Sequence, residues 1–222
     1  HYIILYLDLY IFASIYHIVN NKIKHYKVEI IMQDPFERFA EWFEEAHKSE
    51  DMAEAMSIAT VDEHGRPSVR MVLLKDHGPE GFTFYTNLSS RKGSEIAQNP
   101  NMAFCFHWKS LARQIRIEGE VSPVSDEEAD AYFASRAKDS QIGAWASKQS
   151  QPMEGRFEFE ARILKYTSKF GLGQVPRPEF WSGFRLNPRR IEFWQDRKFR
   201  LHDRHIYSRN EQGGWDNQTL YP

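Results

Sequence analysis

The stretch that decides the fold is Ala55-Met-Ser-Ile-Ala-Thr-Val61, followed by Asp62-Glu-His-Gly65 and Ser68-Val-Arg-Met-Val-Leu-Leu-Lys75. The outer two segments are typical of strands and the middle one of a turn, so they predict a β-hairpin. The same signals predict three further strands, over 81–86, 102–108 and 113–121. Because no helix separates every pair of strands, we expect a mainly β protein with helices (α+β), an antiparallel barrel or sandwich decorated by helices.

Capping signals place the helices around these strands. Asp34 as N-cap and Pro35 at the first helical position open a helix that should run to about Lys48. Ser89 or Ser90 caps a short helix that ends near Gln98, and Ser125 begins a capping box. The remaining expected elements are a helix from Ser125 to about Arg136, a helix over 153–170, and strands over 191–195 and 205–209.

The composition and the absence of certain motifs argue against several classes of protein. The chain has 222 residues, 41% of them hydrophobic, so it can bury a core, and its net charge of -2 is not that of a protein that coats nucleic acid. The single cysteine, Cys105, lies in an alternating strand, where we expect a buried structural thiol, and it favours a reducing compartment such as the cytoplasm. No zinc spacing, P-loop or dinucleotide fingerprint is present, so we expect no metal.

The N-terminal segment differs in composition from the rest. Ile, Tyr, Asn, Lys and Phe dominate residues 1–31, and the first Met is Met32. We expect residues 1–33 to be an extension that is disordered or not native, and residues 34–222 to form the functional domain. The apolar run from Tyr2 to Val19 leaves a membrane anchor as the less favoured alternative.

Two groups of basic residues stand where structure alone does not require them. Arg91 and Lys92 fall in the first turn of a helix, where cations are unfavourable unless an anion is bound, so they indicate a phosphate site or else a solvated pair. Between Arg177 and Arg209, nine basic residues face four acidic ones. At strand spacing, Arg200, His202 and Arg204 would share one face. The acidity of the whole chain and the confinement of the basic excess to one segment favour a small anionic ligand over single-stranded nucleic acid or a solvated face.

At these residues the chain resembles the pyridoxamine 5′-phosphate oxidase family. The matching strings, spread over roughly residues 34–222, are Arg70-Met-Val-Leu-Leu-Lys75, Phe84-Tyr-Thr-Asn87, Ser90-Arg-Lys92, Arg113-Gln114, Tyr132-Phe-Ala-Ser-Arg136, Asp139-Ser-Gln-Ile-Gly-Ala144, Ser147-Lys-Gln-Ser150, Val175-Pro176, Phe180-Trp181, Ile191-Glu-Phe-Trp-Gln195 and Arg200-Leu-His-Asp-Arg204. The resemblance implies an FMN-binding split β-barrel and a homodimer with its sites at the subunit interface.

The resemblance also implies roles for individual residues. It assigns FMN contacts to Arg70, Met71, Val72, Leu73, Leu74, Lys75, Tyr85, Thr86, Arg91, Lys92, Gln114, Gln149, Ser150, Trp194 and Arg204. It assigns substrate contacts to Lys75, Tyr132, Arg136, Ser140, Arg200, Leu201 and His202. Of these, Arg200 and His202 are expected to position the substrate over the flavin and assist proton movement, because His titrates near neutrality.

The implied activity is oxidation of pyridoxamine or pyridoxine 5′-phosphate to pyridoxal 5′-phosphate, with O2 reduced to hydrogen peroxide. Two other functions stay open at this point. One is a different split-barrel flavoprotein, such as a flavin reductase, that shares only the FMN half of the site. The other is a non-catalytic module that binds pyridoxal phosphate or RNA through the C-terminal arginines.

Overall fold

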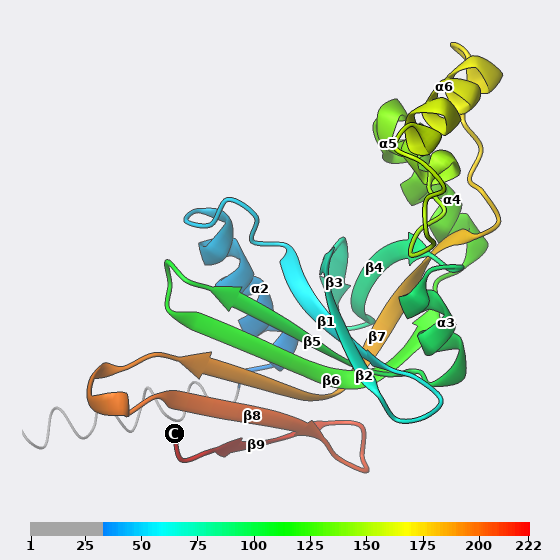
Figure 1. Cartoon of the computed structure of the whole chain (residues 1–222). Coiled ribbons are helices and arrows are strands. Elements are labelled where there is room, and N and C mark those ends of the chain that lie inside the picture. The colour runs from blue at the N-terminus through cyan, green and yellow to red at the C-terminus, as the bar shows by residue number, and fades with distance from the viewer. Residues whose placement is uncertain (1–32) are drawn as a thin grey trace, which may run out of the picture.

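The protein is built on one curled antiparallel sheet with helices around it (Figure 1). The computed structural model describes residues 33–222, so the expectations for residues 1–32 fall outside it. The strands are β1 (Ala55–Val61), β2 (Pro67–Leu73), β3 (Asp76–Gly78), β4 (Gly81–Asn87), β5 (Asn101–Trp108), β6 (Arg113–Pro123), β7 (Trp181–Gln195), β8 (Asp203–Arg209) and β9 (Trp215–Thr219). Their order is β2-β1-β5-β6-β7-β4-β3, and β8 joins β7 to β9. The predicted mixed, antiparallel class is confirmed.

The longest strand, β7, connects the two ends of the sheet. Its first half, from Trp181, pairs with β4, and its second half, to Gln195, pairs with β8, while β6 runs beside almost all of it. The register between β6 and β7 shifts at Glu118/Gly119, opposite Pro188. A Cβ on Gly119 would lie 2.1 Å from the Asn187 carbonyl oxygen, so the close approach at this bulge requires glycine.

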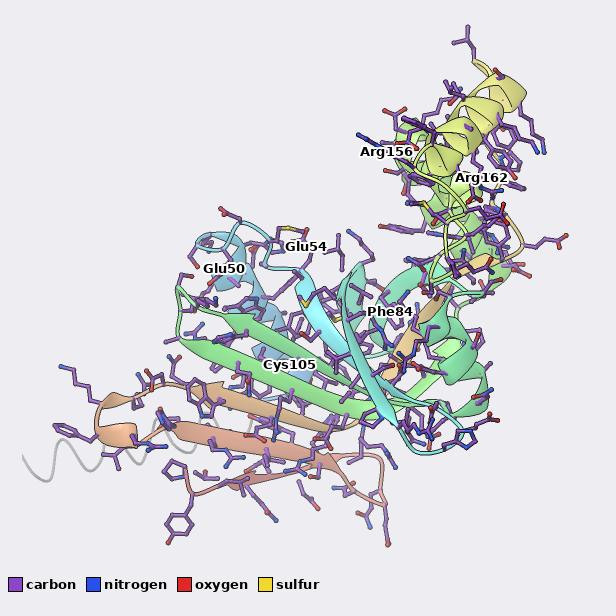
Figure 2. All side chains as sticks on the ribbon, viewed as in Figure 1. Glu50, Glu54, Phe84, Cys105, Arg156 and Arg162 are labelled. Atoms are coloured by element: carbon purple, nitrogen blue, oxygen red, sulfur yellow. The ribbon has the colours of Figure 1, made fainter. Side chains whose placement is uncertain are left out.

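The helices fall into two groups. Helices α2 (Pro35–His47) and α3 (Arg91–Gln98) pack on the sheet, whereas α4 (Asp126–Ser135), α5 (Lys138–Ala146) and α6 (Glu158–Phe170) form an arm to one side of it (Figure 1). Figure 2 shows Arg156 and Arg162 on this arm, and Phe84 within the sheet. No helix in the described part of the chain is long and apolar enough to cross a membrane.

An aromatic core holds α2 against the sheet. Phe39 is fully buried, and its ring lies 4.8 Å from that of Phe82 and 5.4 Å from that of Phe106. Edge-to-face pairs of this kind stabilise a core by about 0.5–1.5 kcal/mol each beyond the burial of their area. A second, smaller cluster around Phe133, Ile142 and Trp181 packs the arm against the start of β7.

The predicted helix starts are confirmed by their side-chain caps. Asp34 Oδ1 accepts a hydrogen bond from the Phe36 N–H at 2.7 Å, and Ser90 Oγ accepts from Gly93 at 3.3 Å. Ser125 Oγ accepts from Glu128 at 3.1 Å. Each cap satisfies an N–H group that would otherwise lack a partner at the helix end.

Several elements differ from the prediction. The strand expected over 191–195 begins ten residues earlier, and α6 begins at Glu158 and not at residue 153. Gly183 and Pro188 obscure β7 in the sequence because both residues are rare in strand interiors. Helix α5 was not predicted, since Ala137 makes no side-chain cap. Strands β3 and β9, which are short, were also missed.

Residues 200–204 do not form one strand, so the strand spacing considered for Arg200, His202 and Arg204 does not apply. A 3-10 turn covers Lys198–Arg200, with φ of 60° at Phe199 and at Arg200, and β8 begins only at Asp203. Arg200, His202 and Arg204 therefore do not share a face through strand spacing. Cys105 also differs from the prediction, because it lies on β5 with intermediate exposure and is not fully buried.

Candidate functional site

A large cavity lies where β2, β4 and α3 meet the arm. Its volume is about 1020 Å³, and its lining includes five cationic side chains, those of Arg70, Lys75, Arg91, Lys92 and Arg136. No carboxylate lines it among the described residues. Because like charges repel unless a counter-charge is present, this lining indicates a strongly anionic ligand with more than one negative charge.

Lys92 is the most enclosed of these cations. It sits in the first turn of α3, is 7% exposed, and donates hydrogen bonds to Thr86 Oγ1 at 2.9 Å and Gln149 Oε1 at 3.0 Å. Burial, together with the nearby Arg70 charge, lowers the pKa of Lys92 from 10.5 to about 8. Arg91 and Lys92 both line the cavity, so the positive start of α3 lies at its wall, an arrangement that suits a phosphate.

Arg70 and Arg91 stand beside Lys92. Arg70 Nη2 donates to Glu95 Oε2 at 3.1 Å, and Arg91 Nε donates to Glu95 Oε1 at 2.8 Å. Glu95 does not itself line the cavity. Glu95 is a residue of α3, its carboxylate pairs with both arginines, and its side chain is 5% exposed.

The arm side of the cavity is aromatic with a second cationic group. The Tyr85 ring stacks on Tyr132 at 4.0 Å and on Trp181 at 5.2 Å. The Arg136 guanidinium lies 4.9 Å from the Trp181 ring centre, and its Nη1 is buried with no hydrogen-bond partner. Burial lowers the pKa of Arg136, while the nearby Tyr132 opposes that shift. An unpaired buried donor is costly, and because the Arg136 side chain lines the cavity, its guanidinium supplies a cation to an anionic ligand on this side.

Glu128 on α4 ties the arm to the sheet beside the stacked tyrosines. Tyr85 donates to Glu128 Oε1 at 3.3 Å, and Arg185 reaches both oxygens of the same carboxylate, at 2.8 and 2.9 Å. Burial and the Glu128 charge raise the pKa of Tyr85, so its hydroxyl stays protonated. This connection fixes the aromatic wall relative to β7.

The structure brings most of the predicted site residues together. The cavity is lined by the predicted residues Arg70, Met71, Val72, Leu73, Lys75, Tyr85, Thr86, Arg91, Lys92, Gln149, Ser150, Tyr132, Arg136 and Ser140. Leu74 does not line it and is a core residue that is 4% exposed. Gln149 and Ser150, far from α3 in the sequence, come close to it through the loop after α5.

The other six predicted residues, Gln114, Trp194, Arg200, Leu201, His202 and Arg204, do not line this cavity. Three of them are neighbours across the sheet, since Trp194 pairs with Gln114 on β6 and with Arg204 on β8. The His202 ring lies 4.8 Å from the Trp194 ring, and His202 Nδ1 lies 2.8 Å from Asp196 Oδ1. Arg204 Nε donates to the buried carboxylate of Glu192 at 2.8 Å. We call Gln114, Trp194, Arg200, Leu201, His202 and Arg204 the C-terminal group.

Sequence reasoning missed part of the cavity wall. Ser68, Val69, Asn87, Ala137, Gly143, Ala144, Ser147, Phe159 and Trp181 also line it. Trp181 follows Phe180 in a string that resembles the family, which was its available signal. Asn87 likewise ends a string that resembles the family, whereas Ser68 has no distinctive spacing. The described residues hold no cluster of His, Cys, Asp and Glu suited to a metal ion.

The fold and the cavity together define a split-barrel protein with a cationic cavity. Two solved structures share the fold. PhzG from Burkholderia lata, in complex with tetrahydrophenazine-1-carboxylic acid, superposes with a TM-score of 0.81 at 28% identity, over 85% of this chain and 93% of that one. A pyridoxamine 5′-phosphate oxidase-related, FMN-binding protein from Nostoc punctiforme gives a TM-score of 0.71 at 17% identity, over 86% of this chain and 100% of that one.

The chain belongs to the pyridoxamine 5′-phosphate oxidase family. The model of that family matches residues 43–170, and that of the pyridoxine 5′-phosphate oxidase C-terminal dimerisation region matches residues 181–222. The pyridoxine/pyridoxamine 5′-phosphate oxidase of Maricaulis maris is 58% identical over 191 residues, which are 85% of this chain and 86% of that protein. The enzyme of the same name from Rhodospirillum rubrum is 57% identical over 196 residues, 86% and 97% of the two chains. The resemblance drawn from the sequence is confirmed.

Proposed function

We propose that the protein is an FMN-dependent oxidase that converts pyridoxamine or pyridoxine 5′-phosphate to pyridoxal 5′-phosphate and reduces O2 to hydrogen peroxide. The observation that carries the proposal is the cavity, which has five cationic side chains and no carboxylate in its described lining. A flavin mononucleotide and a phosphorylated substrate together bring two phosphates, and these match two separate cationic regions. Similarity to enzymes named pyridoxine/pyridoxamine 5′-phosphate oxidase supports the choice of substrate.

The residues beside α3 fit the FMN phosphate. Arg70, Arg91 and Lys92 supply charged donors, and the start of α3 adds backbone N–H groups. Bound FMN would accept the two electrons of the substrate carbon and pass them to O2. The protein's part is to hold that carbon against the flavin ring and to exclude other reactions, because fixed geometry removes much of the entropic barrier.

The arm side of the cavity fits the substrate phosphate. Arg136 has a buried Nη1 without a partner, and Tyr132 and Ser140 add hydroxyl groups. The planar guanidinium can bind two phosphate oxygens at once, which a lysine cannot do. Lys75 also lines the cavity and adds a further cation.

A second copy of the chain would complete the site. Trp181 lines the cavity, whereas Trp194 lies thirteen residues further along the same strand. At about 3.3 Å per residue, that is roughly 40 Å of strand, too long for one ligand to touch both. The match of residues 181–222 to a dimerisation region supports a homodimer in which the partner contributes its C-terminal group. In that arrangement His202 and Arg200 would face the substrate of the partner's cavity.

The proposal places the protein in the cytoplasm, where the unpaired thiol of Cys105 stays reduced. The test is anaerobic mixing of the purified, FMN-loaded protein with pyridoxamine 5′-phosphate while the flavin absorbance is followed. Bleaching, followed by recovery on admission of O2 with release of hydrogen peroxide, is expected. Bound flavin that does not bleach would indicate a flavoprotein with another substrate. Purified protein that binds no flavin would indicate a non-catalytic module.

A further inference from the structure

Glu95 is a buried carboxylate that the proposed chemistry does not use directly. It lies in the middle of α3, is 4% exposed, and receives four side-chain donors, from two other elements, β1 and β2, and from its own helix. The Oε2 atom accepts from Thr60, from Ser68 at 2.6 Å and from Arg70 at 3.1 Å, while Oε1 accepts from Arg91 at 2.8 Å. Each oxygen therefore holds a different arginine of the cavity wall.

The hydroxyl groups beside Glu95 extend this arrangement to Arg70. Thr60 Oγ1 donates to Glu95 and accepts from Arg70 Nη1, and Ser68 Oγ donates to Glu95 and accepts from Arg70 Nη2 at 2.5 Å. The Arg70 guanidinium is thus fixed on one side by β1, β2 and α3 together. A fixed guanidinium loses less entropy when it binds an anion than a mobile one does.

Glu95 is ionised over the whole physiological range. Burial alone raises the pKa of Glu95, but hydrogen bonds from Ser68, Thr60, Arg91 and Arg70 outweigh burial and lower the pKa to about 2. The carboxylate is therefore a permanent negative charge behind the cations. Its charge reduces the sum over Arg70, Arg91 and Lys92 from three to two, the charge of one phosphate dianion.

We propose that Glu95 is a positioning residue of the phosphate site, holding Arg70 and Arg91 so that the terminal N–H groups of Arg91 and the Nε–H of Arg70 face one phosphate dianion. The inference rests on the proposed function, since it assigns the phosphate to FMN. Its effect should be confined to the phosphate part of binding, because Glu95 does not line the cavity and cannot touch the flavin ring.

Two other roles for Glu95 predict different results. If the carboxylate only reduced positive charge, its removal would strengthen attraction for a dianion, and FMN would bind more tightly. If it only stabilised the fold, its removal would weaken FMN and riboflavin binding to the same extent. Positioning alone predicts weaker FMN binding with riboflavin binding unchanged.

The experiment compares FMN and riboflavin binding to the apoprotein by flavin fluorescence, for wild type, Glu95→Gln and Glu95→Asp. Gln keeps the size and loses the charge, while Asp keeps the charge but is one methylene too short to hold both arginines. The matched control is Asp130→Asn, which loses a carboxylate that pairs with Arg177 at 2.5 Å outside the cavity. Thermal unfolding of each apoprotein is measured in parallel.

We expect both Glu95 variants to weaken FMN by about 10- to 100-fold and riboflavin by less than about twofold, and the control to change neither. Tighter FMN binding by Glu95→Gln, wild-type binding by Glu95→Asp, or equal losses for the two flavins would overturn the inference. If Glu95→Gln does not fold, the loss of FMN binding relative to the loss of riboflavin binding in Glu95→Asp tests the inference in the same way. A wild-type protein that binds FMN no more tightly than riboflavin would instead refute the proposed phosphate site itself.

Discussion

The Nδ1 atom of His202 lies 2.8 Å from Oδ1 of Asp196, and the His202 ring packs 4.8 Å from the ring of Trp194. With Nδ1 directed at a carboxylate, the imidazole presents Nε2 away from it. Asp196 immediately follows β7, and His202 immediately precedes β8, so the pair closes the turn between two paired strands. This geometry gives the proposed catalytic histidine a fixed orientation.

Asp196→Asn should therefore slow the reaction without releasing flavin. The amide can still accept a hydrogen bond but no longer carries the charge that orients the imidazole, so kcat/KM should fall about tenfold or more, or ~1.4 kcal/mol. Flavin content and single-turnover reduction are the measurements. Loss of flavin with normal reduction after reloading would contradict the assignment of His202 to the substrate.

Lys92 should make FMN binding depend on pH above about 8. Its pKa in the apoprotein is lowered to about 8, so the free site loses a cation as pH rises past that value. A bound dianion favours the protonated ammonium, so binding above pH 8 takes up a proton and the FMN Kd should rise by up to tenfold per pH unit. Below about pH 6 the FMN phosphate itself gains a proton and loses one negative charge, so the FMN Kd should also rise there.

Lys92→Arg is the matched control for that pH dependence. The guanidinium stays charged across this range, so the rise in Kd between pH 8 and 10 should disappear even if affinity at pH 7 is lower. Titration of the apoprotein with FMN at several pH values measures both. An unchanged pH dependence in the variant would show that another group titrates.

Arg136→Lys should impair the substrate and spare the flavin. Lysine keeps the charge but loses the planar fork and the contact with Trp181, so we expect kcat/KM for pyridoxamine 5′-phosphate to fall by about 10- to 100-fold with normal flavin content. Arg177→Lys, which changes an arginine paired with Asp126 and Asp130 outside the cavity, is the control and should keep wild-type kinetics.

Gly93→Ala should displace α3 and weaken the phosphate site. A Cβ at Gly93 would lie 2.1 Å from the backbone carbonyl oxygen of Leu88, and backbone cannot move aside cheaply. We expect a loss of about 1–3 kcal/mol in apoprotein stability together with weaker FMN binding. Gly143→Ala on α5 meets nothing within 4 Å, so its apoprotein should melt at the same or a higher temperature. Equal melting temperatures for the two variants would contradict this account.

A shared site predicts that two inactive variants restore each other. Lys92→Ala damages the cavity and Arg204→Ala damages the C-terminal group, so each homodimer loses both sites. Equal amounts, denatured and refolded together, should regain about a quarter of wild-type activity, because half of the dimers hold one intact site. Activity no greater than the sum of the separate variants would refute sharing between subunits.

The sequence predicted the parts of the molecule that depend on local signals. The caps Asp34, Ser90 and Ser125 were found because each accepts from a nearby backbone N–H. The first half of β7 was missed because Gly183 and Pro188 are unfavourable in strands, and the bulge at Gly119 that accommodates Pro188 lies on β6. That compensation comes from a strand far away in the sequence.

The same limit applies to the site. The string containing Gln149 gave no sign that its side chain would contact Lys92, since only the chain path around the arm brings them to 3.0 Å. From the sequence alone, Glu95 is expected to be an ordinary polar residue of a short helix. It is buried because its carboxylate packs against Thr60 on β1 and Ser68 on β2. Phe199 and Arg200 both have positive φ, and neither residue type favours positive φ, so this turn could not be predicted from the sequence.

The cation-lined cavity has a consequence for how long the protein lasts in a cell. Without a ligand, five like charges line one cavity and Glu95 offsets only one of them, so the remaining counter-charge arrives with the vitamin-derived compounds. A ligand at 100 times its Kd adds about 2.7 kcal/mol to folding stability, which lowers the unfolded fraction open to proteases by about 100-fold. The cellular abundance of this protein is therefore expected to rise and fall with riboflavin supply, even when its synthesis is constant.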